Sequence, residues 1–149
     1  MSERFDDEIL ALIPHRPPML LINQLISLDA SRSEARVLID RDTPFFTPHL
    51  GVPAWIGVEY MGQTSALIAG YQERKGLCEP QLGFLMGARK FRSSVEYFSP
   101  DEALHVECDE AALVGESLAT FSCTIRQERS NKVLATANLS VFRRPLEKP

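Results

Sequence analysis

Hydrophobic and polar positions alternate along much of the chain, but one long stretch has a different pattern. From Thr43 to Gln72 there is no Lys, Arg or Asp, and the only acid is Glu59. Apolar and small residues fall on nearly every side of a helix from about Pro53 to Tyr71. Proline suits the first helical position because its fixed φ is already helical. A helix without a charged face is usually buried, so we expect this helix at the centre of the molecule and Glu59 where water is scarce.

The alternating stretches predict strands on both sides of this helix. A short amphipathic helix that ends at Pro14 comes first, and the tail from Arg143 is expected to be loose. The predicted strands cover residues 19–28, 33–40, 83–95, 104–109, 118–126 and 133–142. We therefore expect an α+β fold in which a strongly curved antiparallel sheet wraps around one long central helix. A second subunit or other elements must cover the rest of that helix.

Length and composition limit the possible functions. The 149 residues favour a single domain over 1–149, and a net charge of −4 argues against a nucleic acid partner. No export signal is apparent at the N-terminus, and the three cysteines have no CxxC spacing, so we expect reduced thiols in a cytoplasmic protein. Glu59, Gln63 and the glycines inside the long helix argue against a membrane span.

His49 and Glu59 are the candidate chemical groups. A neutral imidazole has a pKa of about 6.5 and can accept a proton at cellular pH. A carboxyl group in apolar surroundings has a raised pKa and can stay protonated long enough to donate. A base and an acid of different types in one dry site suit general acid–base catalysis. Two structural alternatives stay open: His49 as a capping or packing residue, and Glu59 as a buried acid paired with Arg or Lys.

Other polar residues receive structural interpretations. His15 is expected to be structural, His105 to point outward from its strand into solvent, and Cys108 and Cys123 to face the core. No cluster of His, Cys and Asp has metal-ligand spacing, and there is no glycine-rich phosphate loop. Neither a metal nor another cofactor is therefore predicted.

Three stretches of the chain resemble the 3-hydroxyacyl-[acyl-carrier-protein] dehydratases of fatty-acid synthesis, the FabZ type, which have the hot-dog fold. They are LIPHRPPMLLI at 12–22, TPFFTPHLGVPAWIGVEYMGQTSALIAGY at 43–71 and GARKFRSSVEYFSPDE at 87–102. Within the second, PAWIGVEYMGQT is more similar to the dehydratase-like proteins of aryl-polyene gene clusters. The loop after His49 is shorter than in the housekeeping enzymes, and Ala54 stands where their helix begins with glycine.

The resemblance implies a function and an assembly. The expected reaction converts (3R)-3-hydroxyacyl thioesters on acyl-carrier protein into trans-2-enoyl thioesters, in fatty-acid or aryl-polyene-type lipid synthesis. The expected assembly is a dimer in which His49 of one subunit faces the partner's Glu59, giving two sites. The backbone N–H groups of Ala54 and Trp55, at the positive end of the helix dipole, are candidate donors to the thioester oxygen. Gln63 is a candidate for substrate binding, for orienting Glu59 or for packing alone.

Acyl-carrier proteins are acidic, so docking would need a local basic patch on this acidic chain. The candidates are Arg89, Lys90 and Arg92, with Arg143 and Arg144 as further members, and a solvated strand face is the equal alternative. A homodimer or larger homo-oligomer is expected. The altered loop keeps open a weakly active or non-catalytic subunit that forms a heterodimer with a second dehydratase. An acyl thioesterase is the weaker alternative, because hot-dog thioesterases usually lack this loop histidine.

Overall fold

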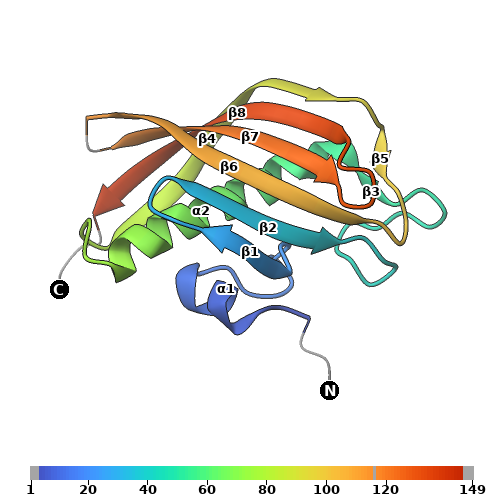
Figure 1. Ribbon diagram of the computed structural model, residues 1–149, viewed down its shortest axis with the longest axis horizontal. Helices are drawn as coiled ribbons and strands as arrows, with labels where there is room; N and C mark the ends of the chain where they lie inside the picture. The colour runs from blue at the N-terminus through green and yellow to red at the C-terminus, as the bar shows by residue number, and fades with distance from the viewer. Residues whose placement is uncertain (1–3, 116, 146–149) are drawn as a thin grey trace.

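A curved antiparallel sheet wraps around one long helix in the computed structural model, which describes residues 4–115 and 117–145 (Figure 1). The sheet has six strands in the order β1-β2-β6-β7-β8-β4. They are β1 (Gln24–Leu28), β2 (Arg32–Leu38), β4 (Gln81–Ser93), β6 (Ala103–Val114), β7 (Leu118–Gln127) and β8 (Val133–Pro145). Helix α2 (Gly57–Arg74) follows a 3₁₀ turn, η1 (Ala54–Ile56). The α+β hot-dog fold predicted from the sequence is confirmed.

The core lies between the inner face of the sheet and α2. Buried side chains alternate with exposed ones along the strands, as a half-buried sheet requires. On β2 the buried positions are Ser33, Ala35 and Val37, and on β7 they are Ala119, Phe121, Cys123 and Ile125. Helix α2 contributes Tyr60, Met61, Thr64, Leu67 and Ile68. Cys108 and Cys123 are both free and buried, so their predicted place in the core is confirmed.

The N-terminal segment is fixed along α2 at two points. Helix α1 (Asp7–Leu12) comes close to α2 at Gly70, where an added Cβ would lie 2.2 Å from the carbonyl oxygen of Leu12. Further along, the side-chain amide of Gln63 accepts a hydrogen bond from the N–H of Leu21 and donates one to the carbonyl of Met19, both at 2.8 Å. A glycine and a glutamine of α2 thus position the segment between Leu12 and Leu21.

Several predicted boundaries differ from the observed ones. The strand expected from residue 19 begins only at Gln24, because Met19 and Leu21 bond to Gln63 rather than to a strand. The loose tail expected from Arg143 is wrong for residues 143–145, which extend β8, and residues 146–149 lie outside the described part of the chain. The two-residue strands β3 (Val52–Pro53) and β5 (Tyr97–Phe98), which pair with each other, were not predicted, because such short strands show no alternation.

One face of α2 has incomplete cover. Val58, Gly62, Ala66 and Ala69 are only partly buried, and Glu59 is exposed. The expectation that Glu59 is shielded from water is therefore wrong for the single chain, because the chain's own sheet does not reach this face. Strand β4 lies at the edge of the sheet and, among the described strands, pairs only with β8. None of the helices in the described ranges is both long and apolar enough to cross a bilayer.

Candidate active site

Glu59 lines a cavity of about 380 Å³ between α2, the edge strand β4 and the N-terminal segment. The cavity follows α2 from Glu59 to Glu73, a distance of roughly 20 Å at 1.5 Å per residue. Its walls are mainly small or apolar, and they include Gly62, Ala66, Ala69, Leu82, Leu85, Phe121 and Val141. Small residues at this spacing fall on one side of a helix and leave room beside it. The result is a long apolar slot with a carboxyl group near one end.

Arg143 closes the far end of this cavity and is already neutralised. The residue is only 5% exposed, and its side chain donates hydrogen bonds to Glu110 at 3.1 Å and to Gln72 at 3.4 Å. The guanidinium also lies 5.7 Å from the centre of the Phe121 ring. The expectation that Arg143 adds to an exposed basic patch is therefore wrong, since its charge is buried and paired.

His49 lies at the tip of a tight loop outside the cavity. The backbones of Thr47 and Gly51 exchange hydrogen bonds of 2.7 and 2.9 Å, and His49 between them has a φ of 69°. Gly51 has a φ of 103°, and a Cβ there would lie 1.9 Å from the carbonyl oxygen of Phe98, so only glycine fits. Within the described residues, no hydrogen bond or ion pair joins His49 to Glu59. The two groups thus make no direct contact within one chain, and their pairing across two subunits stays a prediction.

At the start of the long helix, one backbone N–H group rather than two is a candidate donor to the thioester oxygen. The N–H of Ala54 donates to the carbonyl of Glu96 at 2.9 Å, continuing the pairing of β3 with β5. The prediction that the Ala54 N–H is free to bind an oxyanion is therefore wrong. The N–H of Trp55 lies in the first turn, where a helix provides no acceptor of its own, and it stays a candidate. The Trp55 side chain is 67% exposed.

Gln63 and the predicted docking residues have different surroundings. Both ends of the Gln63 amide bind the backbone, which gives this side chain a structural role, and its contact with substrate stays a prediction. Arg89, Lys90 and Arg92 are exposed on β4, where the pairing with β8 shifts register between Arg89 and Arg92. Within residues 4–115 and 117–145 no ion pair neutralises these three basic side chains, so they are available to an acidic partner.

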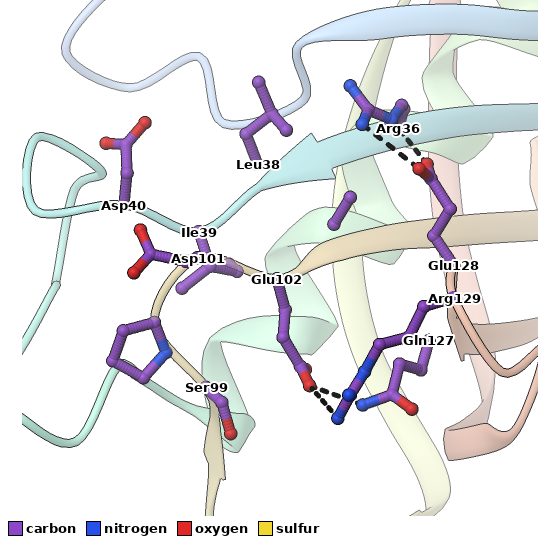
Figure 2. A pocket seen from close by; sticks show the side chains of 12 residues that line it. Arg36, Leu38, Ile39, Asp40, Ser99, Asp101, Glu102, Gln127, Glu128 and Arg129 are labelled. Carbon is purple, nitrogen blue, oxygen red and sulfur yellow. Dashed lines mark hydrogen bonds and ion pairs between the residues drawn. The ribbon is translucent and has the colours of Figure 1, made fainter.

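A larger hollow, of about 680 Å³, lies where β2 ends and the turns before β6 and β8 meet (Figure 2). Its charged side chains mostly pair with one another: Arg36 with Glu128, and Arg129 with Glu102. Arg36, helped by His105, lowers the pKa of Glu128 to about 2. No group of side chains in the described ranges is arranged to hold a metal ion. We therefore locate the candidate site at the α2 cavity.

A known family matches almost the whole chain. The family model described as ApeP-like, ApeP dehydratase, matches residues 7–148. The chain belongs to the ApeP-like dehydratase family. The recognition of a FabZ-like dehydratase close to the aryl-polyene proteins is confirmed.

Relatives of this ApeP-like chain include FabZ dehydratases from several bacteria. The 3-hydroxyacyl-[acyl-carrier-protein] dehydratase FabZ of Nitrosospira multiformis is 26% identical over 147 residues, covering 94% of this chain and 97% of the relative. The FabZ of Alkaliphilus metalliredigens is 33% identical over 114 residues, covering 71% and 73%. The match thus extends over most of both proteins.

Solved structures give the same picture of the fold. The dehydratase heterocomplex ApeI:P of Xenorhabdus doucetiae contains a chain with a TM-score of 0.79 and 25% identity, covering 91% of this chain and 90% of that one. A hypothetical thioesterase of Streptococcus pneumoniae, solved with coenzyme A, has a TM-score of 0.64 at 6% identity, covering 84% and 88%. The second likeness shows the shared fold alone.

His15 is the cavity residue that the sequence interpretation missed. In this ApeP-like chain it lines the cavity together with Glu59, although its sequence context predicted only a structural role. Burial lowers the pKa of His15, and the negative charge of Glu59 opposes this shift. A signal was present in the sequence, since His15 lies in the first of the three stretches that resemble FabZ. His105 points outward from its strand, as expected, and bonds there to Glu128 at 2.9 Å on the outer face of the sheet.

Proposed function

We propose that this chain dehydrates (3R)-3-hydroxyacyl thioesters carried on acyl-carrier protein, forming trans-2-enoyl thioesters. The observation that carries the proposal is the apolar cavity along α2 with the carboxyl group of Glu59 near one end. A slot of this kind suits a hydrocarbon chain whose reactive end must meet an acid. Membership in a dehydratase family and similarity to proteins named as 3-hydroxyacyl-[acyl-carrier-protein] dehydratases support the choice of reaction.

The proposed reaction divides between two side chains. His49, as a neutral imidazole, accepts the proton from C2, and the electron pair left behind forms the C2–C3 double bond. Glu59, as a protonated carboxyl group, donates its proton to the C3 hydroxyl, which leaves as water. The N–H of Trp55 faces the thioester oxygen, where negative charge develops, and one such donor contributes roughly 3 kcal/mol to transition-state stabilisation.

This division requires a second subunit. In one chain Glu59 is exposed and His49 lies outside its cavity, so neither a complete site nor a dry one is present. A partner laid against the open face of α2 would cover Glu59 and exclude water from around its carboxyl group. The free edge of β4 runs beside the same cavity and is where we place the contact. The partner is a second copy or a second dehydratase.

The test is enoyl-thioester formation by the wild type and by His49→Ala and Glu59→Gln. Loss of a general acid or base costs roughly 10²- to 10⁴-fold in rate, and we expect each variant to lose activity in that range. His105→Ala is the matched control, because this third histidine lies on the outer face of the sheet, and it should keep wild-type activity. Wild-type rates in both single variants would refute the assignment of roles.

A second candidate function is a weakly active or non-catalytic subunit that pairs with another dehydratase. It is favoured by the likeness to a chain of the ApeI:P dehydratase heterocomplex and by the shortened loop after His49. The two functions are separated by assaying the chain alone and with a dehydratase encoded beside it. If the complex is active and stays active with His49→Ala and Glu59→Gln in this chain, catalysis belongs to the partner.

A further inference from the structure

We propose that His15 is a positioning residue for Glu59: a half-buried imidazole that holds the Glu59 carboxyl group in the α2 cavity. The inference rests on the proposed function, because it assigns a partner to the acid which that function uses. Three observations carry it: the segment of His15 packs against α2, one nitrogen of its ring is unpaired, and both side chains line the same cavity.

The backbone that carries His15 is held firmly against α2. On one side Leu12 is pressed against Gly70, and on the other Met19 is bound by Gln63, so the intervening residues run back along the helix toward Glu59. The guanidinium of Arg16 stiffens this segment by donating hydrogen bonds to the carbonyls of Leu10, Ile13 and His15 at 2.7, 2.9 and 2.7 Å. A ring carried by such a segment has a fixed place over the cavity.

The His15 ring has a hydrogen-bonding atom without a partner. Its Nδ1 is buried, and no atom of the described residues bonds to it. Leaving a buried polar atom unpaired destabilises the fold, so its persistence calls for an explanation. Glu59 lines the same cavity, is exposed, and makes no hydrogen bond or ion pair within the described residues. Its side chain is therefore free to turn toward His15 when a second subunit covers this face.

The charge of His15 suits this role. Burial lowers its pKa and Arg16 lowers it further, whereas Glu59 raises it. Glu73 and Arg143 are the other charged groups of the cavity, and they lie toward its far end. The imidazole is therefore neutral at cellular pH, and it can donate to a carboxylate or accept from a carboxylic acid. A cationic ring would stabilise the carboxylate and weaken Glu59 as an acid, whereas a neutral ring orients it without that penalty.

The first test needs no catalysis. The three imidazoles of the folded wild type are titrated by NMR and assigned with His49→Ala and His105→Ala. Glu59→Gln should lower the pKa of His15, because it removes the carboxylate that raises it. The ring signals of His105, whose acidic neighbours are Glu34 and Glu128, serve as the internal control and should be the same in the wild type and in Glu59→Gln. An unchanged His15 pKa in folded Glu59→Gln overturns the proposal.

The second test compares His15→Asn, which keeps a donor and an acceptor, with His15→Phe, which keeps only the volume. We expect His15→Phe to lower kcat roughly tenfold or more with little change in KM, and to shift the pH profile of kcat, while His15→Asn keeps most of the activity. Equal losses in the two folded variants, or wild-type profiles in both, contradict a hydrogen-bonding role.

If His15→Phe fails to fold, the activity of His15→Asn is compared with that of Glu59→Gln. The proposal then requires that His15→Asn keeps most of the activity and Glu59→Gln loses it. If the wild-type complex is inactive, the proposed function is refuted. The NMR titration still shows whether the Glu59 carboxyl group interacts with His15.

Discussion

Tyr60 follows Glu59 in the chain but has the opposite environment. Its side chain is fully buried beside Phe98, with ring centres 5.9 Å apart, and its hydroxyl has no hydrogen-bond partner among the described residues. Burial raises the pKa of this phenol well above its usual value. The hydroxyl therefore never ionises near neutral pH, and Tyr60 serves as a packing residue that carries one unsatisfied polar atom.

Removing the Tyr60 hydroxyl group should not destabilise the fold. We expect Tyr60→Phe to leave the free energy of unfolding unchanged or to raise it by up to about 1 kcal/mol, because the lost hydroxyl makes no bond. Urea denaturation measures the effect. Ser33→Ala is the control, since it deletes a buried hydroxyl that donates to the carbonyl of Thr64 at 2.6 Å, and it should destabilise. A Tyr60→Phe variant as unstable as Ser33→Ala would contradict this account.

At the scale of single residues, the sequence predicted which residues are chemically important better than it predicted which groups they bond to. Glu59 and His49 were identified because each is unusual in its stretch, and the cavity around Glu59 supports that choice. The bonds that occupy the Ala54 N–H and the Gln63 side chain were not predictable, because their partners lie far away in the chain. Periodicity is a local signal, whereas these contacts depend on how distant segments meet.

At the scale of elements, β4 combines features that its pattern only partly predicted. A strand from about residue 83 was expected, and β4 runs over Gln81–Ser93. Its place at the sheet edge and its irregular pairing between Arg89 and Arg92, where Lys90 has a φ of 55°, follow from tertiary pairing alone. Charged side chains and bulges on an edge strand discourage non-specific pairing with other sheets. We propose that the same exposed cations also bind an acidic carrier protein.

Reversing the charge of the basic side chains tests whether β4 binds a carrier protein in addition to protecting the sheet edge. We expect Arg89→Glu with Arg92→Glu to lower kcat/KM for carrier-bound substrate several-fold and to leave turnover of a small acyl thioester nearly unchanged, because only the carrier needs the basic surface. The effect should shrink as ionic strength rises. Arg129→Glu with Lys132→Glu, an equal charge change around the β7–β8 turn, is the matched control. An equal loss with both substrates would argue against docking at β4.

At the scale of the whole molecule, the sequence correctly predicted that the central helix needs more cover than one sheet. The sheet and the N-terminal segment cover α2 on two sides, and the remaining face opens into the cavity beside β4. Strand β4 also exposes apolar side chains, with Met86 65% exposed and Leu82 and Leu85 partly so. Exposed apolar side chains on an unpaired edge strand mark a surface that associates. Whether the partner is a copy or a homologue was not predictable, because both would cover the same face.

Association through β4 can be tested directly. We expect Met86→Asp to weaken the dimer or the complex with a second dehydratase by roughly tenfold or more, because it places a charge in an apolar contact. Analytical ultracentrifugation measures the loss. Leu113→Asp is the matched control, because Leu113 is 51% exposed near the β6–β7 turn and its substitution should leave association intact. Since the proposed site needs groups from two subunits, enoyl formation by Met86→Asp should recover at high protein concentration. Tight association of Met86→Asp with unchanged activity would place the interface elsewhere and separate Glu59 from the partner's His49.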